Sequence, residues 1–370
     1  MYSAFHLVTN NVSDVVREHQ QQLDRPVIGV MPAYFPMELI EAAGGYPVQL
    51  WGNNLPIQHA DSHLQGYCCS VAKSIMELEL RGSADMVQAY AFTTLCDTLV
   101  NLREIYERVF SKPQVVLSMP MTRTMDARRS YLESGVESIV KGLEEITAQQ
   151  ITPTSLAESA ALFGRTRELQ RELYQIRRVS PGLIGNRDFY AVIKAGFFLP
   201  RTVYNTMLED LLKKLKPLSP PKGKRPRIVI SGLVFDPIDI FSTLDDLQVD
   251  VVDDDFANGW RTVSKKTLRT DNLVDGVAEY LYEAAPCCCL YNAENDRHDY
   301  LVDKTKQADA DGVLFWYINF CEPDAFDAPL LKERLKKEGI PVSSIDVELT
   351  MSHFDAVKTR LNAFSEILEG

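Results

Sequence analysis

Seven cysteines are the side chains in this sequence most able to do chemistry. They are Cys68, Cys69, Cys96, Cys287, Cys288, Cys289 and Cys321. Thiolates bind soft metals and take part in redox reactions, whereas a buried free cysteine packs as a small inert hydrophobe. Residue type alone therefore leaves three interpretations open: inert thiols, redox-active thiols and metal ligands. No ferredoxin-type or zinc-ribbon spacing is present, so a metal site has to be assembled from distant segments.

Three of the cysteines fall where helices are predicted to begin. Cys96 follows a predicted strand over 85–92, Cys321 follows a predicted strand over 311–320 and precedes a predicted helix, and Cys69 opens a predicted helix. Ligand sites of open α/β sheets lie outside the carboxyl ends of their strands. Helix N-termini also lower thiol pKa values and stabilise anions. These positions are compatible with a metal or cluster site on the three cysteines, and equally with inert buried thiols as the main alternative. Three protein ligands would leave one iron of a four-iron cluster open to an outside ligand.

The elements that must position these cysteines indicate two α/β lobes. Apolar runs typical of buried parallel strands occur at 27–32, 47–52, 85–92, 113–120, 227–232, 249–255, 311–320 and 340–348. Helical patterns alternate with these runs, which favours mainly parallel sheets covered by helices. We predict an α/β protein with two Rossmann/flavodoxin-like lobes, over 1–120 and 226–370. A helical connector over 121–225 joins them and ends in the proline-rich stretch SPPKGKRPR. Similar openings of the two lobes suggest an internal duplication.

The composition narrows the class of protein. The chain has 370 residues, of which 45% are hydrophobic and 24% charged, as in ordinary globular proteins. It contains no run of ~18 apolar residues and no signal-peptide pattern, so we expect a cytoplasmic protein without a membrane partner. Structural disulfides are not expected in that reducing compartment. A net charge of −12 repels phosphate backbones, which argues against nucleic acid as a partner.

Several segments resemble a known family. In the first half they are MPAYFPMELIEAAGGYPVQLWG, ADSHLQGYCCSVAKSIMELELRGSADM and TTLCDTLVNL, and in the second half IVISGLVFDP, VVDDDFANGWR, PCCCLYNAENDR and ADGVLFWYINFCEPDAFDAPLLKERLKKEGIPVSSIDVE. They resemble the 2-hydroxyacyl-CoA dehydratase and benzoyl-CoA reductase superfamily, in its dehydratase D-component family. The resemblance covers nearly the whole chain outside the middle helices. The segments around Cys69 and Cys96 are most similar to the smaller cluster-binding subunit of ATP-dependent benzoyl-CoA reductases.

The resemblance implies a cofactor, partners and a reaction. Members usually bind a [4Fe–4S] cluster through three cysteines, whose places are matched here by Cys69, Cys96 and Cys321. The implied partners are a homologous second catalytic subunit, an acyl-CoA substrate and a separate ATP-hydrolysing iron–sulfur activator. No Walker sequence G-x-x-x-x-G-K-S/T occurs here, which agrees with ATP being used elsewhere. The implied reaction is reduction of an aryl-CoA thioester of the benzoyl-CoA type, ahead of radical dehydration of a 2-hydroxyacyl-CoA. A non-catalytic partner or cluster-maturation subunit is the alternative from another class.

The cysteines also depart from the family pattern. Cys68 doubles the first ligand, and 287–289 crowd a place where many relatives have one cysteine. Some relatives carry a double-cubane [8Fe–9S] cluster on six cysteines and reduce small molecules. Seven cysteines would suffice in number, but no extra cysteine lies between Cys69 and Cys96 as in that branch. We interpret 287–289 as a buried strand end.

A few other polar residues are weaker candidates. His63 and His298 could act as acids or bases, but a structural or solvent-facing role is the favoured interpretation. The acids at 253–255 are interpreted as caps of a turn or helix rather than as a metal site. Arg261 and Arg297 are candidates to meet CoA phosphates, because arginine pairs well with phosphate.

Overall fold

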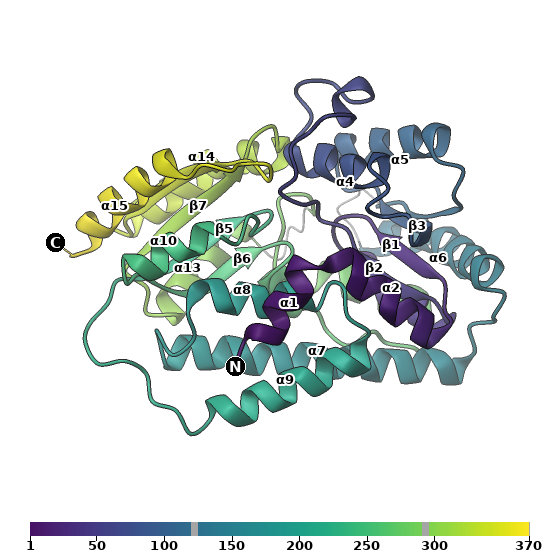
Figure 1. The fold of residues 1–370 in the computed structure, drawn as a ribbon, viewed down its shortest axis with the longest axis horizontal. Helices are drawn as coiled ribbons and strands as arrows, with labels where there is room; N and C mark the ends of the chain where they lie inside the picture. Colours follow the sequence, from purple (N-terminus) through teal and green to yellow (C-terminus); the bar gives the residue numbers. More distant parts are fainter. Residues whose placement is uncertain (120–124, 291–295, 370) are drawn as a thin grey trace.

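The chain contains two parallel β-sheets, one in each lobe (Figure 1). The computed structural model describes residues 1–119, 125–290 and 296–369. The end of the predicted strand 113–120, the start of the predicted connector and part of the PCCCLYNAENDR motif lie outside these residues. The first sheet contains β1 (Val27–Val30), β2 (Tyr46–Gln49), β3 (Val87–Thr93) and β4 (Gln114–Leu117). The second contains β5 (Arg227–Gly232), β6 (Asp250–Phe256), β7 (Gly312–Ile318) and β8 (Val342–Val347).

The two sheets have the same strand order. It is β2-β1-β3-β4 in the first and β6-β5-β7-β8 in the second, and every pair is parallel. In this order the chain reverses direction across the sheet between its first and third strands, which opens a crevice at their carboxyl ends. The central strands β1 and β5 are apolar because helices cover both of their faces. The predicted α/β class with two Rossmann/flavodoxin-like lobes is confirmed.

Helices cover the sheets of both lobes. In the first lobe they are α3 (Met37–Ala42), the short 3₁₀ helix η1 (Ala60–Ser62), α4 (Ser70–Leu80) and α5 (Asp97–Val109). In the second they are α10 (Ile240–Asp246), α11 (Trp260–Val263), α13 (Arg297–Gln307), α14 (Glu322–Lys337) and α15 (Asp355–Glu369). The helix α12 (Leu273–Tyr282) comes from the second half of the chain but packs against the helix over 125–147, which lies on the first sheet. Within the described parts of the chain, no helix is both long and apolar enough to cross a membrane.

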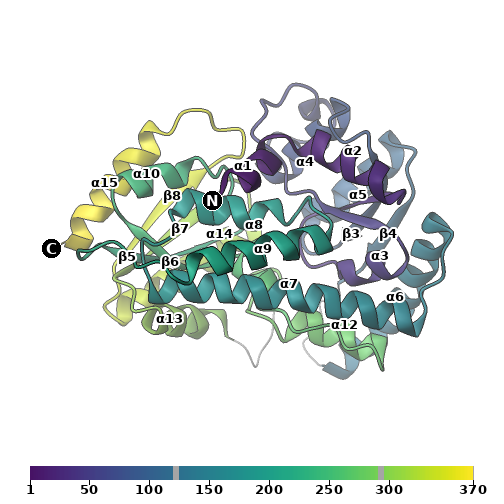
Figure 2. The same cartoon turned by 60° about the horizontal axis from the view of Figure 1, so that its bottom comes forward.

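Six further helices complete the fold of the described residues. They are α1 (Ser3–Asn10), α2 (Val12–Leu23), α6 (Met125–Thr147), α7 (Pro153–Val179), α8 (Asn186–Ala195) and α9 (Arg201–Leu215). A capping box between Thr152 and Ser155 starts α7, which then runs along both lobes (Figure 2) and contacts α3 and β6. Most of the predicted linker over 219–227 contains neither helix nor strand. The division of the chain at residues 120 and 225 stays a prediction.

Candidate functional site

Cys69, Cys96 and Cys321 each occupy the N-cap position of a helix. The helices are α4, α5 and α14, respectively. Cys96 is the third residue after the end of β3, and Cys321 is the third residue after the end of β7. These two strands hold the same place in their sheets, so the two cysteines are equivalent in the two lobes. The predicted helix starts are therefore confirmed for all three cysteines.

One cavity brings these three cysteines together. It has a volume of about 290 Å³ and is lined by Cys69 and Cys96 from the first lobe and Cys321 from the second. The three cysteines of 287–289 line the same cavity, so six of the seven thiols border one space. Cys68 does not line it, and its thiol instead donates to Oε1 of Gln65 at 3.7 Å. The structure thus sets Cys68 apart from the other six thiols.

The spacing of the thiols distinguishes two sets. Within residues 1–119, 125–290 and 296–369, only the sulfurs of 287–289 bring three candidate ligand atoms within 4.8 Å of one another. The sulfurs of Cys69, Cys96 and Cys321 are more widely spaced. A single tetrahedral ion with metal–sulfur bonds of about 2.3 Å sets its sulfurs roughly 3.8 Å apart. In a four-iron cluster each cysteine binds a different iron, which requires a wider spacing. The wider set therefore fits a cluster better than a single ion.

Burial controls the protonation of the wider set. Burial raises the pKa of Cys69 to about 11, although the backbone N–H groups of Ala72 and Val71 act in the opposite direction. Burial likewise raises the pKa values of Cys96 and Cys321. The prediction that helix N-termini lower these pKa values is wrong in its net result, because desolvation outweighs the helix ends. A metal centre would have to displace the thiol protons as it binds.

Three non-glycine residues with left-handed backbone lie at this cavity. Ala33, Tyr34 and Phe320 line it and have φ values of 69°, 67° and 61°. Left-handed backbone is uncommon for residues other than glycine and tends to cluster at functional sites. The hydroxyl of Thr93 donates to the Ala33 carbonyl at 2.9 Å and holds the first of these turns. Sequence reasoning missed Tyr34, although its place just past the carboxyl end of β1 was the available signal.

The acidic triplet at 253–255 lies inside β6 rather than at its end. All three carboxylates are buried. Only Asp254 acts in part as a cap, because its Oδ1 accepts the backbone N–H of Trp260 at the start of α11 at 3.0 Å. Asp253 pairs with Nζ of Lys304 at 2.8 Å. The prediction of simple end-of-strand caps is therefore wrong for the triplet as a whole, because the strand continues through it and basic side chains neutralise it.

Four other candidates do not line the cavity. Arg261 and Arg297 are buried and both bind Asp255, with Nε of Arg261 at 2.9 Å and Nη2 of Arg297 at 3.0 Å. Neither is free to meet CoA phosphates, so that prediction is wrong. His298 contacts a carboxylate of α14 at 3.0 Å, and His63 is exposed after η1. The structural and solvent-facing interpretation of the two histidines agrees with these positions.

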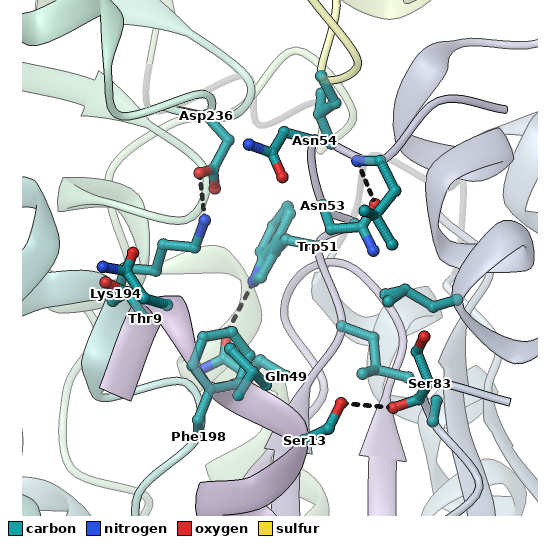
Figure 3. A pocket seen from close by; sticks show the side chains of 18 of the residues that line it. Thr9, Ser13, Gln49, Trp51, Asn53, Asn54, Ser83, Lys194, Phe198 and Asp236 are labelled. Atoms are coloured by element: carbon teal, nitrogen blue, oxygen red, sulfur yellow. Dashed lines mark hydrogen bonds and ion pairs between the residues drawn. The ribbon is translucent and has the colours of Figure 1, made fainter. Parts of the chain in front are cut away.

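A second and larger cavity shares a wall with the cysteine cavity. Its volume is about 510 Å³, and Trp51 lines both spaces. Figure 3 shows Trp51 with its indole N–H directed at Gln49, which accepts this hydrogen bond at 3.0 Å, and the Lys194–Asp236 ion pair on one side. Oδ2 of Asp236 is buried and finds no hydrogen-bond partner among the residues that the structure describes.

Known proteins align with almost the full chain. The family model of the 2-hydroxyglutaryl-CoA dehydratase D-component matches residues 32–368. The (R)-phenyllactyl-CoA dehydratase beta subunit of Clostridium sporogenes is 26% identical over 99% of this chain and 98% of its own. The beta subunit of lactoyl-CoA dehydratase from Anaerotignum propionicum is 27% identical over 98% and 96%. A subunit of the benzoyl-CoA reductase from Thauera aromatica is 25% identical over 93% and 91%. The motifs, the paired parallel sheets and these matches together show that the chain belongs to the 2-hydroxyglutaryl-CoA dehydratase D-component family.

Proposed function

We propose that this chain is the iron–sulfur subunit of an acyl-CoA enzyme and holds a [4Fe–4S] cluster on Cys69, Cys96 and Cys321. The observation that carries the proposal is the convergence of three N-cap thiols, from both lobes, on one cavity. The subunit role is supported by the relatives, which are named as subunits of dehydratases and of a reductase.

The chain's own residues prepare the site in two ways. Apolar side chains of Leu95 and Leu233 line the cavity from the two lobes and keep water away from the thiols. The helix ends behind the thiols direct backbone N–H groups toward the sulfurs, which stabilises negative charge on them once their protons have left. When bound, a cluster of this kind supplies one-electron transfer, whose potential is set by such hydrogen bonds and by burial.

Radical dehydration of a 2-hydroxyacyl-CoA is the first candidate reaction. It is supported by the description of the matching family and by the two dehydratase relatives. Reduction of an aryl-CoA thioester, which the motifs favoured, is the second candidate and is supported by the relative from a benzoyl-CoA reductase. Both reactions need a homologous second subunit and an ATP-hydrolysing activator. Stoichiometry separates them, because a reductase uses electrons and ATP in each turnover whereas a dehydratase uses them only for activation.

The larger cavity is the proposed place for the pantetheine arm of the substrate. Its volume is that of a site for a small organic molecule. The amides of Asn53 and Asn54 and the unpartnered oxygen of Asp236 match the amide groups of pantetheine. Lys194 and Arg187 each pair with an aspartate, so among the described lining residues no unpaired cation is present for the phosphates. The nucleotide end of the CoA would therefore lie outside this cavity. Trp51, which lines both cavities, would stand between the pantetheine arm and the cysteine thiols.

The second subunit is proposed to cover the open side of the cysteine cavity. Phe320 and Phe326 line this cavity, yet 56% and 81% of their surfaces are exposed. Large exposed aromatic side chains next to a reactive site are typical of surfaces that a partner protein covers. A second chain seated there would also limit the access of oxygen to the cluster.

Metal analysis of the anaerobically purified protein tests this function. We expect a brown protein with about four cluster irons per chain and an EPR signal on reduction. Cys96→Ser should lose this signal, whereas the matched control Cys68→Ser should keep it, because Cys68 does not line the cavity. A colourless wild-type protein, or a Cys96→Ser variant with the full cluster signal, would contradict the proposal.

A further inference from the structure

The three consecutive cysteines lie in a tight turn. The backbone N–H of Leu290 donates to the carbonyl of Cys287 at 3.0 Å, and these two residues form an isolated β-bridge. The turn directs the three side chains to one point, so that their sulfurs lie within 4.8 Å of one another. The sulfurs of Cys288 and Cys289 are 4.0 Å apart. The predicted buried strand end is therefore wrong, because the chain reverses here and presents the thiols to the cavity.

This spacing fits a single ion. The separation of 4.0 Å between two of the sulfurs is close to the value of roughly 3.8 Å that one tetrahedral ion requires. A disulfide between neighbours in sequence is a poor alternative. Adjacent Cα atoms are about 3.8 Å apart across a trans peptide, whereas disulfides usually join Cα atoms about 4.4–6.8 Å apart. The geometry thus favours shared metal coordination over oxidation within the turn.

The surroundings of the turn orient one of its sulfurs. Nη1 of Arg261, which is fully buried, donates to Sγ of Cys287 at 3.4 Å. Asp255 holds the other side of the same guanidinium, at 2.9 and 3.0 Å. Such groups behind a ligand fix its orientation and balance its charge. This explains why a carboxylate–arginine pair is kept inside the second lobe directly behind the thiols.

Tyr34 borders the cysteine turn from the first lobe. Its hydroxyl is buried, and the side chain with which it interacts is the thiol of Cys287. The residue lines the cysteine cavity with a strained backbone, and its hydroxyl lies near Cys287. A hydroxyl beside a metal-ligating sulfur can orient that ligand and balance part of its charge.

We propose that Cys287, Cys288 and Cys289 form a second metal site that holds one thiophilic divalent ion, Zn²⁺ or Fe²⁺. Three thiolates select such ions over hard cations, and a fourth coordination position would face the cavity. The three thiol protons leave to solvent as the ion binds, and no electron transfer is required. The buried Arg261 offsets part of the excess negative charge of three thiolates around a divalent ion. The site borders the same cavity as the wider cysteine set but uses none of its thiols.

Metal content of single variants separates the two sites. Cys288→Ser should lose about one zinc or iron per chain and keep the cluster EPR signal, because one thiolate of three is removed. Cys96→Ser should show the reverse, with the cluster signal lost and the single ion kept. Cys68→Ser, as the matched control, should keep both. Equal metal content in wild type and a folded Cys288→Ser variant would overturn the second site, whereas a cluster retained by Cys96→Ser would overturn only the proposed function.

A cobalt titration gives a second readout that does not depend on how Cys288→Ser matures. The full-length Cys96→Ser variant, cleared of bound metal and titrated anaerobically with Co²⁺, should develop thiolate-to-cobalt charge-transfer absorption that saturates near one equivalent. The same titration of Cys96→Ser combined with Cys289→Ser should give a clearly weaker band. Bands of equal intensity in the two proteins, or no band in the first, would contradict a site on the turn.

Discussion

Glu77 holds the segment that leads into Cys69 against α4, and its replacement is a quantitative test of how this cysteine is positioned. The Glu77 side chain is fully buried. One oxygen accepts the backbone N–H groups of His59 and Ala60 at 2.8 and 2.9 Å, and the other binds Nε of Arg81 at 2.6 Å. Burial by itself raises the pKa of Glu77, but these hydrogen bonds lower it by a larger amount. The net pKa is about 2, compared with an ordinary value of 4.5. That difference corresponds to about 3 kcal/mol of folding stability.

Glu77→Gln keeps the shape of the side chain but removes the charge. We expect the free energy of unfolding to fall by about 3 kcal/mol at pH 7, measured by urea denaturation under anaerobic conditions. Because the folded pKa is depressed, the stabilisation is present above about pH 4.5 and is lost as the pH falls toward 2, so the two proteins should converge there. Glu145→Gln, at an exposed position of α6, is the control and should change stability by less than about 0.5 kcal/mol. A loss below about 1 kcal/mol at pH 7 would refute the assigned role.

Three further changes test other parts of the structure. Burial lowers the pKa of Lys265 to about 7. Between about pH 10 and pH 7 the unfolded chain therefore keeps a proton that the folded protein releases, and the resulting loss of stability grows as the pH falls. Lys265→Met should therefore gain stability relative to wild type across that range in urea denaturation, and a difference independent of pH would contradict this. Phe326→Glu should abolish co-purification with the second subunit at unchanged melting temperature, and an intact complex would argue against the proposed interface. Trp51→Ala should raise KM for the acyl-CoA about tenfold, equivalent to about 1.4 kcal/mol, with the cluster EPR signal unchanged; an unchanged KM would place the substrate elsewhere.

The helix-start cysteines could be predicted because the signal is local. A buried strand, a short turn and an amphipathic helix follow one another around Cys96 and Cys321, and parallel sheets place such turns at one edge. The same reasoning could have found Tyr34, which follows β1. The pKa of the thiols was predicted in the wrong direction, since a sequence shows the helix end but not the depth of burial around Cys69.

The acidic strand and the cysteine turn could not be predicted because their partners are distant in sequence. Asp255 is neutralised by Arg261, six residues away, and by Arg297, 42 residues away. Three adjacent acids are rarely buried, so strand pattern alone assigns them to a surface turn. Likewise, the side chains of 287–289 converge because the chain reverses direction there. The hydrogen bond between Leu290 and Cys287 that defines this reversal leaves no repeating pattern in the sequence. The choice between dehydration and reduction depends on the substrate and the second subunit.

The most direct test of the central claim is the position of iron in crystals grown anaerobically, located by anomalous diffraction at the iron edge. We predict a strong iron peak in the cavity of about 290 Å³, within bonding distance of the sulfurs of Cys69, Cys96 and Cys321. The absence of iron there in a brown, EPR-active protein, or a four-iron cluster bound by other residues, would contradict the assignment of these three cysteines.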